Sequence, residues 1–141
     1  MQKIKKLIKL KDILLEGAMS KQEIISIVKK VYPKIVSTLG RARKGTPKVS
    51  AHSSIYSRLS GVEGMMGTAN PHAEYDWNSN EIYLYIPRMT SVEQIIRSLL
   101  HEYTHSKQDY EKMKEYRNKG YANNPYEKAA KRAESNWRKY I

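Results

Sequence analysis

Two histidines four residues apart, with a glutamate directly after the first, are the residues of this sequence best suited to chemistry. They are His101, Glu102 and His105, in the pattern HExxH. On a helix, residues four apart lie on the same face, so both imidazoles can reach one metal ion. Glu102 would lie about 100° further round, where it can act on a metal-bound water without being a ligand. A tetrahedral zinc held by two histidines still needs a third protein ligand and a water.

The residues around this motif predict an amphipathic helix. Thr90 and Glu93 form a capping box at its start, and Ser91 with Gln94 offers a second one, one residue later. We expect the helix to continue to about Tyr116. Its apolar positions share one broad arc, opposite the histidines: Val92, Ile95, Ile96, Leu99, Leu100 and Tyr103. One face is therefore predicted to pack in the core and the other to face a cleft. A chance pair of exposed histidines is the alternative.

The candidate third ligand is Glu127. It follows Asn124 and Pro125, a good N-cap and first residue for a last helix that runs to about residue 139. Its position three residues after Asn124 also suits a capping-box glutamate, which is a purely structural role. Glu134 lies seven residues on, on the same face, and is the competing ligand. Ala130 lies between the two and would allow close approach to the histidine helix.

Composition limits the classes of protein to consider. The 141-residue chain contains no cysteine, which excludes a disulfide framework, a thiolate metal site and a cysteine nucleophile. No apolar run approaches the roughly 18 residues of a membrane span. Because no small-residue cleavage site follows the basic N-terminal stretch, we do not expect a secretory signal. We expect a single domain over residues 1–141, without a transmembrane segment and located in the cytoplasm.

The formal net charge of +12 is the second compositional signal. Basic residues are densest at 3–11, 41–48 and 128–139. This charge suggests an acidic partner such as nucleic acid, an anionic surface or an acidic protein. No known RNA- or DNA-binding motif accompanies it, so a general contribution to solubility is the alternative.

The rest of the chain predicts a small α+β fold. Residues 1–16 form either a basic amphipathic arm or a helix packed on the body. Ser20 and Glu23 form a capping box for a second helix, which Pro33 should kink or divide and Gly40 should end.

A small sheet is predicted after these helices. A short strand is expected near residues 48–51, followed by an irregular segment over residues 53–71. A β-hairpin is expected over residues 73–86, with its turn at 78–80. In its second strand Ile82, Leu84 and Ile86 should face the core, with the intervening tyrosines half exposed. The edge of that strand should lie beside the cleft.

The stretches HEYTH and NPYEKAA resemble the zincin metallopeptidases. HEYTH matches their zinc-binding helix, and a downstream glutamate on a second helix resembles the gluzincin arrangement. NPYEKAA is similar to the third-ligand helix of small single-domain and phage-type HExxH peptidases. The resemblance covers about residues 81–137. The longer gluzincin signature and the third histidine of the metzincins are absent.

This resemblance implies a zincin-like fold and a zinc-dependent endopeptidase, cellular or viral, that acts on a peptide or protein. Zn²⁺ would be held by His101, His105 and Glu127, and Glu102 would be the general base. Gln108 and Asp109 are candidate partners of the histidines, whereas His52 and His72 are expected to be ordinary loop histidines. Five tyrosines could polarise the substrate carbonyl, Tyr103 being the weakest candidate: Tyr103, Tyr110, Tyr116, Tyr121 and Tyr126. A non-catalytic zincin scaffold that binds nucleic acid or an acidic protein is the alternative function.

Overall fold

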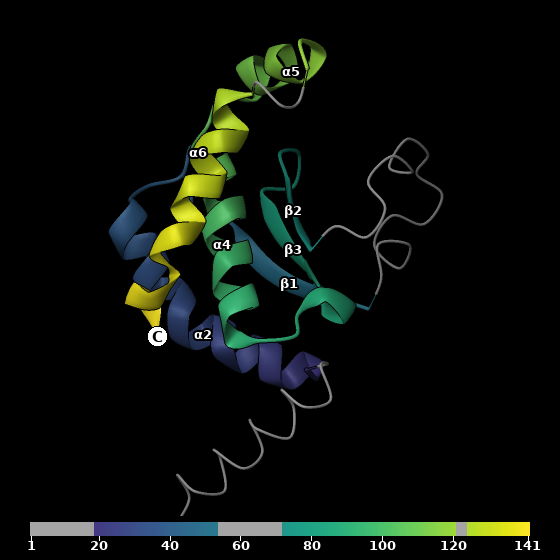
Figure 1. Cartoon of the computed structure of the whole chain (residues 1–141), viewed down its shortest axis with the longest axis vertical. Helices are drawn as coiled ribbons and strands as arrows, with labels where there is room; N and C mark the ends of the chain where they lie inside the picture. Colours follow the sequence, from purple (N-terminus) through teal and green to yellow (C-terminus); the bar gives the residue numbers. More distant parts are fainter. Residues whose placement is uncertain (1–18, 54–71, 121–123) are drawn as a thin grey trace, which may run out of the picture.

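The computed structural model describes residues 19–53, 72–120 and 124–141 (Figure 1). It has the mixed α+β architecture expected from the sequence. Its elements in chain order are α2 (Lys21–Leu39), β1 (Lys48–His52), β2 (Ala73–Asp76), β3 (Glu81–Tyr85), the 3-10 turn η2 (Ile86–Arg88), α4 (Val92–Ser106), α5 (Tyr110–Asn118), α6 (Pro125–Ala133) and the 3-10 segment η4 (Glu134–Tyr140). The predicted arm over residues 1–16 and most of the predicted irregular segment over 53–71 lie outside the described residues.

The three strands form one sheet in the order β1-β3-β2. The predicted hairpin is confirmed, because β2 pairs antiparallel with β3 and Tyr75 lies opposite Ile82. Asn80 takes the left-handed conformation in the turn, with φ 56°, and its Oδ1 accepts a 2.6 Å hydrogen bond from the Tyr75 hydroxyl. β1 runs parallel to β3 on the other side. β3 is therefore the central strand, and the prediction that its edge would lie beside the cleft is wrong.

The second predicted helix is α2, which begins and ends as expected. Ser20 and Glu23 form the reciprocal capping box, and the Gly40 N–H bonds to Val36 O with φ 84° at the glycine. Of the two effects predicted for Pro33, a kink or a division of the helix, division does not occur, because α2 is continuous through Pro33. Pro33 and Lys29, whose carbonyl loses its helical donor, are both exposed. Water can therefore satisfy that carbonyl, which limits the cost of the proline.

The core lies where α2 and α4 pack on the sheet and on one another. The apolar arc predicted for α4 is almost entirely inside, with Ile95, Ile96 and Leu99 each 0 % exposed. Ile82 and Leu84 of β3 are also 0 % exposed, as predicted. The full cluster of buried side chains includes Met19, Ile24, Val28, Val31, Ile35, Ala42, Ala51, Tyr75, Ile82, Leu84, Met89, Ile95, Ile96, Leu99, Leu100, Tyr103 and Tyr140.

Tyr85 departs from the predicted half-exposed pattern. It is buried, at 3 % exposure, whereas Ile86 is only half-buried because the strand ends before it. The Tyr85 hydroxyl donates a 2.9 Å hydrogen bond to Glu74 Oε2 on β2. A satisfied hydroxyl removes most of the cost of burying a tyrosine, so this ring can enter the interior.

The histidine helix α4 is shorter than predicted. Ser91, not Thr90, is its N-cap, and its hydroxyl accepts from the Gln94 N–H at 3.0 Å. The helix ends at Ser106 instead of continuing to Tyr116. A new helix, α5, begins after Asp109, whose carboxylate accepts from the Lys112 N–H. An aspartate at the N-cap accepts hydrogen bonds from the first free N–H groups of a helix. It therefore favours the start of a new helix at this point over the continuation of α4.

The last predicted helix is present, but its second half is a 3-10 helix instead of an α-helix. Asn124 caps α6 by accepting from the N–H groups of Tyr126 and Glu127, as expected. After Ala133 the chain continues as the 3-10 segment η4 to Tyr140. Residues three apart lie above one another in a 3-10 helix. This places Trp137 and Tyr140 together against the core. None of the described helices has the length and apolar composition needed to cross a membrane.

Candidate metal centre

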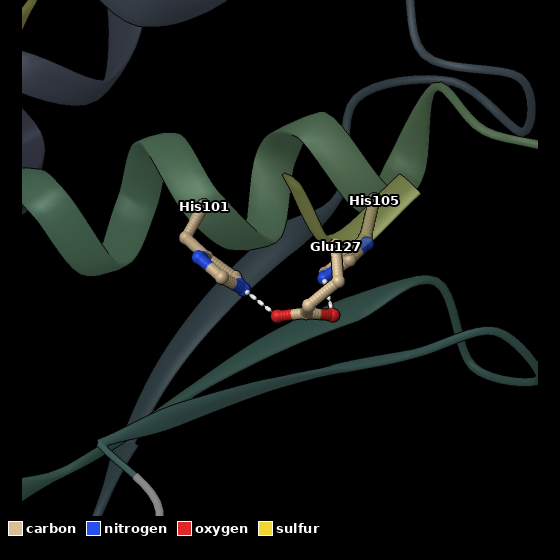
Figure 2. A group of neighbouring side chains, drawn as sticks. All are labelled: His101, His105 and Glu127. Atoms are coloured by element: carbon tan, nitrogen blue, oxygen red, sulfur yellow. Dashed lines mark hydrogen bonds and ion pairs between the residues drawn. The ribbon is translucent and has the colours of Figure 1, made fainter. Parts of the chain in front are cut away.

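Three side chains from two helices converge on one point. His101 and His105 extend from α4, and the Glu127 carboxylate of α6 lies between their imidazoles (Figure 2). His101 Nε2 lies 2.7 Å from Glu127 Oε1, and His105 Nε2 lies 3.2 Å from Glu127 Oε2. The potential ligand atoms of the three residues all lie within 4.8 Å of one another. This group could hold a metal ion.

The other nitrogen of His101 has its own carboxylate partner. Glu134 Oε2 lies 2.7 Å from His101 Nδ1, on the side of the ring away from Glu127. Arg97 Nη1 lies 3.9 Å from the other oxygen of Glu134. Glu134, the competing candidate ligand, therefore hydrogen-bonds to the His101 nitrogen that faces away from Glu127. A carboxylate in that position fixes the ring orientation of a metal-binding histidine and makes it a stronger donor.

His105 is oriented by an amide instead. Gln108 Oε1 lies 2.8 Å from His105 Nδ1, and Gln108 Nε2 donates to Tyr126 O at 3.0 Å. Because a backbone carbonyl only accepts, the amide nitrogen must face Tyr126 and the amide oxygen must face the histidine. His105 Nδ1 then carries the proton, and Nε2 is the nitrogen directed toward the candidate ion position. Gln108 was predicted to have this role, and it also ties α4 to α6.

Glu127 does not serve the capping function that was its structural alternative. The Asn124 side chain accepts from the N–H groups of Tyr126 and Glu127, whereas the two oxygens of the Glu127 carboxylate contact His101 and His105. Ala130 is 0 % exposed between Glu127 and Glu134. As expected for a small residue at this place, it lets α6 lie directly along α4 (Figure 1).

The metal-free cluster is held together by charge. Burial alone lowers the pKa of His101, but its hydrogen bonds to Glu127 and Glu134 outweigh burial and raise that pKa to about 10. Burial raises the pKa of Glu127, but hydrogen bonds from His101 and His105 outweigh it and hold that pKa well below its usual range. The protonated imidazole of His101 thus balances the negative charge of Glu127.

Glu102 is buried, at 8 % exposure, and has no metal-ligand geometry. Burial raises its pKa, the neighbouring imidazoles of His105 and His101 lower it, and Glu127 and Glu74 raise it further. A carboxylate that is desolvated but close to cationic groups is a suitable proton acceptor. This agrees with the position predicted for it, at the boundary between the apolar arc and the histidines.

Aromatic side chains adjoin His105. The Trp77 ring lies 6.4 Å from the His105 ring, and Tyr110 lies 5.3 Å from Trp77, measured between centroids. The contact between Trp77 and His105 was not foreseen. The sequence feature that could have predicted this contact is the position of Trp77, at the turn of the hairpin that precedes α4. Glu74, whose charge acts on Glu102, was also missed.

The five candidate tyrosines lie in different environments. Tyr103 is buried, and its hydroxyl donates to Gly40 O at 2.5 Å, so it is a packing residue as expected. Tyr116 and Tyr126 pack edge to face at 5.2 Å. Tyr110 is the exposed member of the group, at 37 %. Tyr121 lies outside the described residues.

The remaining predicted residues are not ligands in the described group. His52 belongs to β1 instead of a loop, and its Nε2 lies 3.1 Å from Ser50 Oγ. His72 Nε2 lies 3.2 Å from Arg88 Nη2; burial and the Arg88 charge lower the pKa of His72. Asp109, a candidate partner of the histidines, is instead the N-cap of α5.

The donor set of this group is two imidazole nitrogens and one carboxylate oxygen. Two imidazole nitrogens and one carboxylate oxygen are the ligands of many catalytic zinc sites, which keep a fourth position for water. Bonds of about 2.0–2.2 Å in a tetrahedron separate ligand atoms by roughly 3.3–3.6 Å. The 3.2 Å contact of His105 with Glu127 is close to that spacing, whereas the 2.7 Å contact of His101 is a hydrogen-bond distance that would have to lengthen when a metal binds. No hard all-oxygen cage of the type that selects calcium or magnesium is formed by these three residues.

Comparisons with known proteins give no family assignment. No protein-family model matches the chain, and searches of curated proteins and of solved structures find no match.

Proposed function

We propose that the protein is a zinc-dependent peptidase of the zincin type. The convergence of His101, His105 and Glu127 carries the proposal. Glu134 and Gln108 add support, because each holds one histidine by the nitrogen that faces away from the cluster. Histidine pairs that merely pack on a surface do not need such partners. The resemblance of HEYTH and NPYEKAA to zincin helices agrees with this reading.

Bound Zn²⁺ would supply Lewis acidity, lowering the pKa of water from 15.7 to about 7 and polarising the scissile carbonyl. Glu102 accepts the proton of the attacking water and later delivers it to the leaving amine as the C–N bond breaks. Burial of Glu102 beside the cluster places that base in a water-poor environment. The Trp77 ring lies beside His105, and Tyr110 packs against Trp77.

The test is cleavage of fluorescent casein and of a mixed peptide library by zinc-loaded protein. Glu102→Gln keeps the shape of the side chain but removes the proton acceptor, so cleavage should fall about 10²- to 10⁴-fold. Zinc content should be unchanged in that variant. Glu115→Gln, at an exposed position on α5, is the matched control and should cleave normally. Equal cleavage by wild type and Glu102→Gln would contradict the proposed mechanism.

A non-catalytic protein built on the same scaffold is the second candidate function. The net charge of +12 favours a form that binds nucleic acid or an acidic protein. Zinc binding without hydrolysis of any library peptide would favour this candidate over the peptidase.

A further inference from the structure

The segment of α6 and η4 has two faces of opposite charge. Its acidic side chains, Glu127 and Glu134, both turn inward to His101. Its outer side carries five cations, which we call the basic face: Lys128, Lys131, Arg132, Arg138 and Lys139. Both carboxylates of the segment are therefore hydrogen-bonded to His101, and none lies among the cations on the outer side to neutralise their charge.

All five cations of the basic face are exposed. Within the described ranges, no ion pair joins any of them to another residue. Arg138 has a different contact, lying 5.1 Å over the ring of Trp137. Like charges crowded on one helical face destabilise it slightly. An arrangement that is unfavourable in isolation gains stability from an anionic partner.

The side chains of the basic face indicate which class of anionic partner fits it best. The exposed side chains between its cations are Ser135 and Asn136, which are polar. In the part of the chain that the structure describes, the exposed large hydrophobic side chains are Tyr110 and Ile141. One lies on α5 and the other beyond the last cation. Protein interfaces usually have an apolar or aromatic centre, and membrane-surface helices insert apolar side chains. None of the exposed side chains of the basic face is apolar or aromatic, and the Trp137 ring against which Arg138 lies is half-buried and packs on the core.

We infer that the basic face binds the phosphate backbone of nucleic acid. From Lys128 to Lys139 the helical rise gives a length of about 20 Å. One strand of duplex DNA presents a phosphate every 3.4 Å along the axis, so this length spans about six phosphates. Five cations without base-reading geometry suit binding that is independent of sequence. The Asn136 amide between them can donate to phosphate oxygens, whereas the Ser135 hydroxyl already donates to Arg132 O at 2.7 Å.

This binding surface is independent of the proposed hydrolysis. The five cations are exposed, while the carboxylates of the same segment contact His101 of α4. Nucleic acid can therefore occupy the outer side while the metal cluster remains accessible from its own side. Hydrolysis and nucleic-acid binding should therefore be lost through different substitutions. Replacing Glu102 should leave nucleic-acid binding intact.

The experiment is fluorescence anisotropy of a labelled 20-base-pair duplex of arbitrary sequence, titrated with the full chain at several NaCl concentrations. The wild type should bind with a log–log salt slope of up to about −4.5, since each phosphate contact contributes about −0.9. The variant Lys128→Gln/Lys131→Gln/Arg132→Gln should bind about tenfold more weakly at low salt, and its slope should shrink by about 2.7. Circular dichroism and zinc content check that the variant remains folded.

The matched control removes three charges from another exposed helical surface. Lys29→Gln/Lys30→Gln/Lys34→Gln on α2 has the same net charge as the first variant. It should keep the wild-type slope. Equal losses in both triple variants would overturn the assignment, because binding would then follow net charge alone. Binding of polyglutamate with no binding of duplex would also overturn it, in favour of an acidic protein partner.

Discussion

The two faces of α4 are both enclosed, but different forces act on them. On one face Ile95, Ile96 and Leu99 are 0 % exposed and pack against α2 and the sheet. On the other, His101 and His105 hold Glu127 at 2.7 and 3.2 Å. The apolar face gains free energy from burial itself. The histidine face loses free energy from desolvation and regains it only through charged partners.

This difference indicates what each face contributes. The apolar face positions the helix and tolerates similar residues of equal volume. The histidine face depends on particular atoms at particular places, including Gln108 and Glu134 outside the ligand set. Removing one member leaves another buried polar group without its partner, which costs more than the lost hydrogen bond. The predictions below separate these two kinds of dependence.

The largest expected effect on stability belongs to the apolar face. Leu99→Ala leaves a cavity at a fully buried site, so it should lower the free energy of unfolding by about 3 kcal/mol, within a range of roughly 2–5. Urea denaturation of the metal-free protein measures this. Zinc affinity of the folded fraction should not change.

Ile141→Ala is the control for that substitution, because Ile141 is 69 % exposed. It should change stability by less than about 0.5 kcal/mol. A loss below about 1 kcal/mol in Leu99→Ala would mean that this face of α4 is not the packed core described above.

A smaller effect is expected from the residues that orient the histidines. Gln108→Ala should weaken zinc binding about tenfold to hundredfold, because it removes the acceptor at His105 Nδ1 and the tie to Tyr126. Glu134→Gln keeps an acceptor for His101 but loses the charge, so its effect should lie at the lower end of that range. Competition with a chromophoric chelator measures both.

Gln94→Ala is the matched control on α4. Gln94 Nε2 hydrogen-bonds to Ser98 Oγ, far along the helix from the cluster. This variant should bind zinc as the wild type does. Unchanged affinity in both Gln108→Ala and Glu134→Gln would show that their contacts with the histidines have no function in metal binding.

The most gradual effect is that of pH on the metal-free protein. The pKa of His101 is about 10 in the folded chain, above its ordinary value of 6.5. Protonated His101 therefore stabilises the fold fully below about pH 6.5, and this stabilisation decreases as the pH rises toward 10. Between pH 7 and 9 the metal-free protein should lose stability, while zinc affinity should increase because zinc displaces that proton.

The matched variant for pH is His101→Gln, whose stability should vary less between pH 7 and 9. Urea titrations at three pH values compare it with wild type. A wild-type stability that is constant over this interval would contradict the protonated, doubly hydrogen-bonded state of His101.

Local sequence patterns predicted much of the fold and of the site. Capping residues such as Ser20 and Asn124 act on N–H groups two or three positions away, so their effect can be read from the sequence. The same holds for His101 and His105, whose common face follows from helical spacing alone. The apolar arc of α4 was correct for the same reason.

The end of α4 was missed although Asp109 is a local capping signal, but other features depend on relations between distant segments. Nothing within residues 81–86 shows that β1 pairs on the far side of β3, so the strand was predicted to offer an edge. Glu127 and Glu134 share one face of the last helix, and their separate roles depend on how far α6 is displaced along α4. That displacement places Glu127 at Nε2 of His101 and Glu134 at Nδ1. Helical spacing alone does not fix it.

The most direct test of the metal centre is the zinc content of the purified chain after dialysis, measured by atomic emission for wild type, Glu127→Ala and Glu134→Ala. One zinc per wild-type chain, little or none in Glu127→Ala, and weaker but detectable binding in Glu134→Ala is the predicted result. A wild type without zinc, or equal zinc in wild type and Glu127→Ala, would contradict the site.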